Sequence, residues 1–80
     1  MDYRELVELW SVRVTGARNR YERLKARNRE VNREYETMHL ADGEFAKRQA
    51  LRAENDALAE YRRILRIFTD LIIDGKVPLE

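Results

Sequence analysis

The sequence contains no cysteine, only one proline and only three glycines in 80 residues. The lack of cysteine excludes disulfides and thiolate metal sites. The scarcity of proline and glycine leaves few positions at which a helix must end. Because a chain this short has little interior of its own and no covalent cross-link, we expect long helices that gain further burial from a partner.

Long hydrophobic runs and a strong net charge are also missing. The most apolar stretch, ILRIFTDLII, is interrupted by Arg66 and Asp70 and is too short to cross a bilayer. The 16 Lys and Arg residues against 15 Asp and Glu leave a formal net charge of +1, so no field of the whole molecule attracts nucleic acid or membrane. The opening residues, MDYRELVELW, lack the order of a secretory signal. These features predict a cytoplasmic protein that does not enter the membrane.

Residues that carry catalysis or bind cofactors are sparse. The one histidine, His39, stands near Glu36 and Asp42, a set that could touch a metal ion but is ordinarily a polar loop. The sequence has no glycine-rich phosphate loop, no nucleophile paired with a base, and no paired acids in apolar surroundings. We therefore expect no enzyme activity, no metal, no cofactor and no small-molecule substrate.

The first half of the chain has the apolar spacing of a long helix. With one polar exception, apolar or aromatic residues recur in steps of three and four: Tyr3, Val7, Trp10, Val14, Ala17, Tyr21, Leu24, Asn28, Val31, Tyr35 and Met38. This spacing predicts a helix from about residue 2 to residue 38 with heptad packing. Asp2 and Glu5 have the spacing of an N-terminal cap, and Gly16 falls at an outward position through which the helix continues.

A turn over residues 39–43 separates the two halves, because it contains an Asp-Gly pair. No proline or glycine occurs from residue 44 to residue 74, which predicts a second helix over 44–74, capped by Asp42. Gly75 suits the residue after a helix end, and the proline that follows prevents a restart. This leaves a tail over residues 75–80.

The predicted second helix has a wide apolar face. One row continues the heptad pattern through Leu51, Glu54, Leu58, Tyr61, Leu65, Phe68 and Ile72. A neighbouring row widens the face and consists of Ala50, Ala57, Ile64 and Leu71. A face this wide is typical of a helix bundle more than of a two-stranded seam.

These patterns predict an all-α fold in one domain over residues 1–80. We expect a long antiparallel helical hairpin with coiled-coil-like packing, because a short connection makes neighbouring helices antiparallel. Both helices carry additional apolar residues near the open end, so we expect a contact surface there that dimerises the hairpin into a four-helix bundle. The residues expected to carry association are Trp10, Val14, Leu65, Phe68, Leu71, Ile72 and Ile73. The alternative is that the termini fold over this end and cover it.

Asn28 is the polar exception in the first helix and stands at a seam position. A polar side chain there lowers stability but selects register and partner number, since its amide needs a hydrogen-bonding partner. We therefore assign Asn28 as a register-setting residue. Three arrangements remain open: two copies of Asn28 meet in a dimer, Asn28 reaches Asn55 or Glu54 of the facing helix, or Asn28 lies at the edge of the seam and meets water.

Basic residues concentrate in the middle of the predicted hairpin. Residues 13–33 contain eight Arg or Lys against two Glu, and the second helix adds three arginines at the same level. The arginines available to a phosphate backbone or an acidic partner are Arg13, Arg18, Arg20, Arg27, Arg62, Arg63 and Arg66. Two interpretations remain open: a face that binds phosphates, or a solvated surface whose arginines cover the seam and pair with acids.

The sequence therefore predicts a non-enzymatic protein–protein interaction module, such as an adaptor, a small inhibitor or a chaperone-like subunit. We expect it to pair with itself as a homodimer or with a larger protein. The alternative is a dimeric nucleic-acid-binding protein that uses the arginine-rich helical face. In general plan, this alternative resembles the small helical-hairpin dimers that bind paired RNA.

Overall fold

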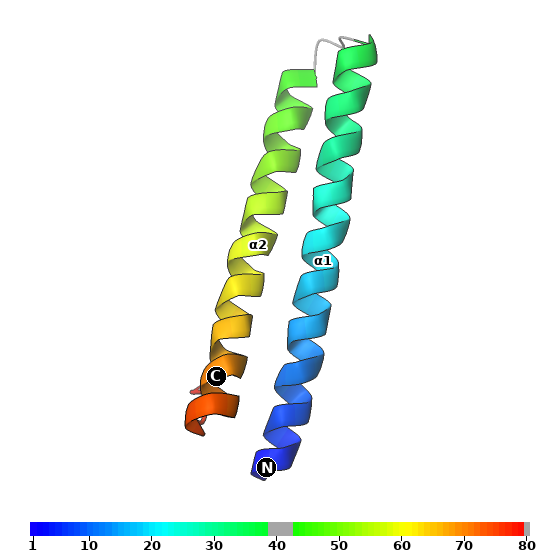
Figure 1. Cartoon of the computed structure of the whole chain (residues 1–80). Helices are drawn as coiled ribbons and strands as arrows, with labels where there is room; N and C mark the ends of the chain where they lie inside the picture. Colours follow the sequence, from blue (N-terminus) through cyan, green and yellow to red (C-terminus); the bar gives the residue numbers. More distant parts are fainter. Residues whose placement is uncertain (39–42, 80) are drawn as a thin grey trace.

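The computed structural model describes residues 1–38 and 43–79, and this part of the chain contains two helices. Helix α1 spans Tyr3–Met38 and helix α2 spans Gly43–Asp74. They lie side by side and antiparallel (Figure 1), and the molecule measures 54 × 18 × 16 Å. The predicted all-α hairpin is confirmed, and each helix begins and ends within one residue of its predicted boundary.

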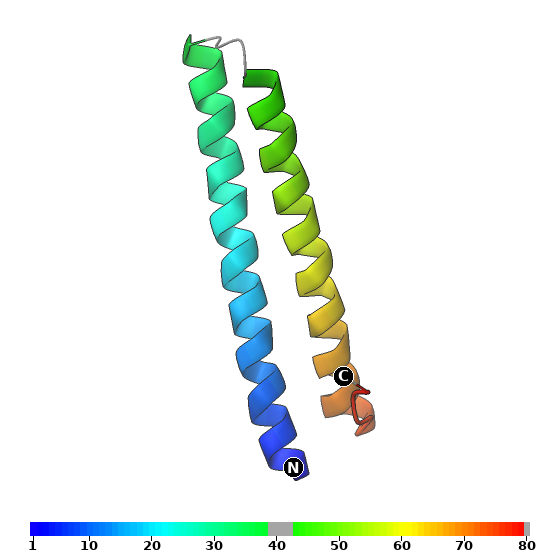
Figure 2. The ribbon, with the colours of Figure 1, turned by 180° about the vertical axis from the view of Figure 1, so that it is seen from behind.

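The helix ends follow the capping signals in the sequence. At the start of α1, the Asp2 Oδ1 atom accepts a 2.8 Å hydrogen bond from the Glu5 backbone N–H, which is the predicted N-terminal cap. After α2, Gly75 adopts a φ of +63°, and the Lys76 backbone N–H donates a 3.3 Å hydrogen bond to the Asp70 carbonyl. The chain therefore reverses direction, and the tail returns along the last turns of α2 (Figure 2).

Two contacts between the helices define which residues lie level with each other. The rings of Tyr21 and Tyr61 stack with their centroids 6.3 Å apart near the middle of the hairpin. Nearer the turn, the Asn28 Nδ2 atom donates a 3.3 Å hydrogen bond to Glu54 Oε1. Each step of seven residues along α1 is thus matched by an opposite step of seven along α2.

The core lies between the helices and is occupied on α2 by the row that the sequence analysis placed second. The buried hydrophobic residues are Trp10, Ala50, Ala57, Ile64 and Leu71. The row expected to continue the seam is divided: its half-buried members are Glu54, Leu58, Tyr61 and Phe68, and its exposed members are Leu51, Leu65 and Ile72. Side-chain size explains this in the turn half, where Ala50 and Ala57 let the two helices approach closely; in the open half the same row contains the large residues Ile64 and Leu71.

The open half of the hairpin (residues 3–20 and 62–74) contains the main hydrophobic cluster. Trp10, Ile64 and Leu71 form its buried centre. Partly buried residues that pack against this centre are Leu6, Val7, Val14, Ala17, Ile67 and Phe68. Large side chains on both helices therefore interlock at this end.

The turn half (residues 22–38 and 43–60) is packed with smaller groups on α2. Gly43 is buried, and a Cβ atom at this position would overlap the Tyr35 ring. A hydrogen bond between the Tyr35 side chain and Glu44 raises the pKa of the Tyr35 hydroxyl above its ordinary value. This half is therefore held by the buried alanines Ala50 and Ala57, by the close glycine–tyrosine contact and by polar bonds.

Candidate protein-binding surface

Four aliphatic residues of α2 stand seven residues apart on the surface of the hairpin. We name Leu51, Leu58, Leu65 and Ile72 the apolar stripe. Leu51, Leu65 and Ile72 are 49%, 40% and 46% exposed, and Leu58 is half-buried. The seven-residue spacing places all four on one line, roughly 32 Å long at 1.5 Å per residue. The apolar stripe is therefore a continuous apolar edge that the hairpin itself covers only in part.

The apolar stripe lies beside the seam because each of its members directly follows a buried residue. Leu51 follows Ala50, and Leu65 follows Ile64. Consecutive helical residues point about 100° apart, so a row next to the core row faces the flank of the hairpin. Leu51 borders a groove together with Asn32 of α1. The flank that carries the apolar stripe is thus formed by both helices.

On its outer side, the apolar stripe is bordered by a polar row of α2. This row consists of Arg48, Asn55, Arg62 and Thr69, all exposed. Arg48 stands three residues before Leu51, and Arg62 stands between Leu58 and Leu65, one helical turn from each. The outer border therefore contains two cations and no acid.

On its inner side, the apolar stripe is bordered by a polar row of α1. This row consists of Ser11, Arg18, Lys25 and Asn32. Lys25 and Arg18 stand seven and fourteen residues before Asn32 and so share its face of α1. The Lys25 Nζ atom lies 5.8 Å from the centroid of the Tyr21 ring. We name the four cations on both sides the basic rim: Arg18, Lys25, Arg48 and Arg62.

The seven residues predicted to carry association are divided between the interior and the surface. Trp10 and Leu71 are 1% and 0% exposed, so within this hairpin they belong to its own core. Val14 and Phe68 are half-buried and pack against that core. The residues that remain on the surface are Leu65, Ile72 and Ile73.

Leu51 and Leu58 extend the apolar surface toward the turn and are not among the seven predicted association residues. Their signal is the seven-residue register that they share with Leu65 and Ile72. The sequence pattern predicts both leucines as seam residues, and the predicted contact surface lies at the open end. Only the position of α1 shows which row is left uncovered.

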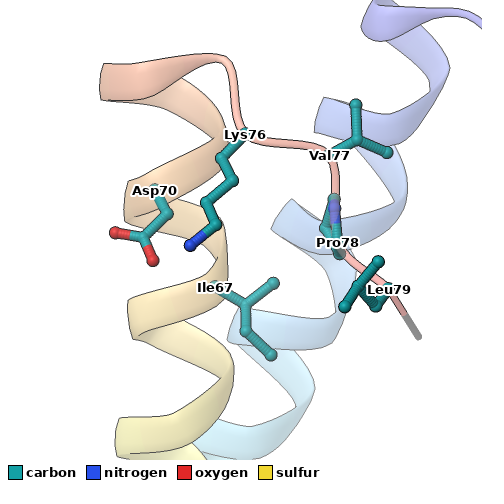
Figure 3. Close-up of a pocket in the computed structure, with 6 residues that line it drawn as sticks. All are labelled: Ile67, Asp70, Lys76, Val77, Pro78 and Leu79. Atoms are coloured by element: carbon teal, nitrogen blue, oxygen red, sulfur yellow. The ribbon is translucent and has the colours of Figure 1, made fainter.

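The C-terminal tail lies on the other flank of the hairpin at its open end. It forms a shallow pocket (Figure 3) with the end of α2, lined by Ile67, Asp70, Lys76, Val77, Pro78 and Leu79. Pro78 is half-buried there, whereas Val77 and Leu79 stay exposed. Ile72 and Ile73 also remain exposed, at 46% and 73%. The alternative in which the termini cover the open end is therefore realised only in part.

Asn28 finds hydrogen-bonding partners within the chain. Besides its bond to Glu54, it accepts hydrogen bonds from the Asn32 Nδ2 atom at its carbonyl, 2.8 Å away, and at its Oδ1 atom, 3.1 Å away. Of the arrangements that the sequence left open, the structure contains the one in which Asn28 reaches Glu54. Its role in setting the register stays a prediction.

The predicted phosphate-binding arginines are spread around the hairpin. One row of α1, on the flank away from the apolar stripe, contains Arg13, Arg20 and Arg27. Arg18 and Arg62 border the apolar stripe, and Arg66 points outward from α2. Because these side chains leave a straight rod in several directions, a single phosphate backbone would contact only some of them.

Part of this basic surface is engaged within the hairpin. The Arg13 guanidinium lies 4.5 Å from the centroid of the Trp10 ring. The Arg63 Nε and Nη2 atoms donate hydrogen bonds of 3.1 and 2.8 Å to the Glu60 carboxylate. The hydrogen bond from Arg63, with the charges of Arg63 and Arg20, lowers the pKa of Glu60 below its ordinary value. These contacts favour the interpretation of a solvated surface with internal ion pairs on that flank.

Metal-ligating side chains do not gather in groups of three or more within residues 1–38 and 43–79. The possible metal set of His39, Glu36 and Asp42 and the predicted helix cap at Asp42 cannot be followed further, because His39 and Asp42 lie outside the described residues. Neither described helix contains a stretch long and apolar enough to cross a membrane.

Comparison with models of known protein families, with curated proteins and with solved structures finds no match to this chain. Function must therefore be inferred from the residues of the hairpin itself. The feature that calls for a partner is the apolar stripe with its basic rim.

Proposed function

We propose that this chain is a non-enzymatic, cytoplasmic protein–protein interaction module whose contact surface is the apolar stripe. It acts as an adaptor, a small inhibitor or a chaperone-like subunit. The partner is either a second copy, which would complete a four-helix bundle, or a larger protein. The observation that supports the proposal is the row of four aliphatic side chains in seven-residue register, three of them 40% to 49% exposed.

Covering the apolar stripe alone contributes too little free energy to hold a partner. Full burial of a Leu or Ile side chain contributes about 1.5–3 kcal/mol, so covering the exposed part of four such side chains contributes roughly 3–5 kcal/mol. Association itself costs at least about 4 kcal/mol. The partner must therefore add apolar side chains of its own and polar contacts around the apolar stripe.

Co-purification with matched variants tests the proposal. The full chain would be recovered from its source cells as wild type, as Leu65→Asp and as Val12→Asp. Val12 is 70% exposed on α1, outside the apolar stripe, and serves as the control for an added charge. We expect wild type and Val12→Asp to retain the same complexes, and Leu65→Asp to lose them by about tenfold or more.

Circular dichroism is the folding control for this experiment, and all three proteins should show the same helicity. Sedimentation of the purified chains separates self-association from binding to another protein. If Leu65→Asp folds normally and retains every complex of the wild type, the proposed contact surface is wrong.

Nucleic-acid binding is the weaker proposal. It draws on the arginine content, but the arginines point in several directions, and Arg13 and Arg63 already contact Trp10 and Glu60. A duplex-RNA titration of wild type against Arg20→Glu with Arg63→Glu would revive it. Tight, salt-dependent binding of duplex RNA by the wild type, together with its loss in the double variant, would favour nucleic acid over protein as the partner.

A further inference from the structure

The flank that carries the apolar stripe is more positive than the molecule as a whole. The chain has a formal net charge of +1. The two polar rows beside the apolar stripe contain the four cations of the basic rim and no carboxylate. Positive charge is therefore concentrated where apolar side chains are exposed.

The acids nearest to the apolar stripe are already engaged or lie farther out. Glu54 accepts a hydrogen bond from Asn28 in the seam. Glu44, at the turn end of the row, is hydrogen-bonded to Tyr35. Glu22 stands one row beyond Arg18 and Lys25 on α1. Glu8 and Glu36 share the row of Glu22, and Glu8 is ion-paired with Arg4; on α2, Asp56 borders a groove with Leu51 and Arg52. None of these acids stands in the two rows that border the apolar stripe, so the charges closest to it are positive.

We propose that the apolar stripe binds an acidic amphipathic helix of another protein, an inference that rests on the proposed function. The incoming helix would place apolar residues at heptad spacing along Leu51 to Ile72. Its flanking Glu or Asp side chains would pair with the basic rim, as charges beside a coiled-coil seam select partners. The pairs next to the apolar stripe would be partly shielded from water, so they would contribute to both affinity and specificity.

A second copy of the chain fits this flank less well. A two-fold symmetric interface brings the same patch of both copies together. Two basic rims would then face each other within a Debye length of about 8 Å at physiological salt, where like charges repel. Charge complementarity therefore favours a foreign acidic helix over self-association through the apolar stripe.

An anionic membrane surface also fits this flank less well. Helices that lie on membranes project a wide apolar face rich in Trp, Phe and Leu. Here Leu58 is half-buried, and Leu51 borders a groove with Asn32, Glu44, Lys47 and Arg48. A concave border of this kind receives a rounded helix more readily than a flat lipid surface.

Two fluorescein-labelled peptides test the inference on the full chain. Each is a helix of about 24 residues, long enough to cover the apolar stripe, with Leu at heptad positions a and d. One peptide has Glu at positions e and g, and the other has Lys there. We expect fluorescence anisotropy at low salt to give an affinity for the Glu peptide about tenfold or more above that for the Lys peptide. High salt should reduce the preference.

Charge-reversal variants locate the binding site. Arg18→Glu with Arg62→Glu should invert the preference, so that the Lys peptide binds more tightly. Arg23→Glu with Arg27→Glu makes the same change in net charge away from the apolar stripe and should keep the wild-type preference. All four substituted arginines are exposed, so the fold should survive in both variants.

Three results would overturn the inference. Equal binding of the two peptides to the wild type would remove the charge argument. A wild-type dimer that Leu65→Asp dissociates would identify a second copy as the occupant. Binding to phosphatidylglycerol-containing vesicles that Leu65→Asp abolishes would identify a membrane. If the peptides bind equally but Leu65→Asp still loses its native complexes, only the acidic character fails and the proposed function stands.

Discussion

The open half and the turn half of the hairpin pack in different ways. In the open half, Trp10, Ile64 and Leu71 form a cluster of large buried side chains. In the turn half, α2 contributes Gly43, Ala50 and Ala57 to the buried row, and the cross-helix contact of Asn28 is polar. Stabilisation by buried apolar side chains is therefore concentrated in the open half.

The apolar stripe does not follow this difference. Leu51 in the turn half is 49% exposed, and Ile72 in the open half is 46% exposed. If loose packing caused the exposure of the apolar stripe, the exposed residues would be confined to the turn half. Because exposure is similar at both ends, the apolar stripe is a property of the α2 surface, and this is why we base the proposed function on it.

The largest expected change in stability comes from a substitution in the open half. Trp10→Ala should lower the free energy of unfolding by about 3–5 kcal/mol, because it removes a side chain that is 1% exposed and leaves a cavity against Ile64 and Leu71. Chemical denaturation followed by circular dichroism measures the change. Trp10→Phe keeps an aromatic ring and removes an indole N–H that has no acceptor among the described residues, so it should cost much less. An unchanged midpoint for Trp10→Ala would remove the distinction between the halves.

A smaller effect is expected in the turn half. Gly43→Ala should destabilise the hairpin by about 1–3 kcal/mol, because the new Cβ atom would overlap the Tyr35 ring and force it to move. Hydrogen exchange should show faster opening of the turn half than of the open half. The double variant Gly43→Ala with Tyr35→Ala is the control, since removing the ring should remove the extra cost of the methyl group. A cost that persists in full without the ring would contradict this contact.

The smallest expected effects separate helix propensity from tertiary packing. Gly16 is exposed in the middle of α1, and a Cβ atom added there would meet no side chain of the described residues within 4 Å. Gly16→Ala should therefore stabilise the chain by about 1 kcal/mol. Gly75→Ala should instead destabilise it by about 1 kcal/mol, since φ at this residue is +63°. Thermal melts of the two variants should shift in opposite directions. Shifts of the same sign would show that one of these backbone assignments is wrong.

Much of the fold could be predicted because it depends on local signals. The alternating spacing from Tyr3 onward, the cap at Asp2 and the stop at Gly75 act within one or two helical turns, and all three are present in the structure. The short connection between two long helices then leaves the antiparallel hairpin as the simple solution. Heptad spacing also placed Gly16 on the outside correctly.

The candidate site could be predicted only in part. The sequence indicated apolar surface near Leu65, Ile72 and Ile73, and these residues are exposed. It also assigned Trp10 and Leu71 to association, although both are buried within the hairpin. A large apolar residue on a wide helical face has the same sequence pattern whether its own hairpin or another molecule covers it.

The sequence by itself determined two long helices, their ends and their antiparallel pairing, because capping, propensity and loop length act between neighbouring residues. Only the tertiary structure decided which of two adjacent rows on α2 faces inward. In the turn half that choice depends on how closely α1 can approach, and the small residues Ala50 and Ala57 allow the closest approach, whereas in the open half Ile64 and Leu71 of the same row pack against Trp10. Their burial turns the next row, from Leu51 to Ile72, toward the flank and creates the surface on which the proposed function depends.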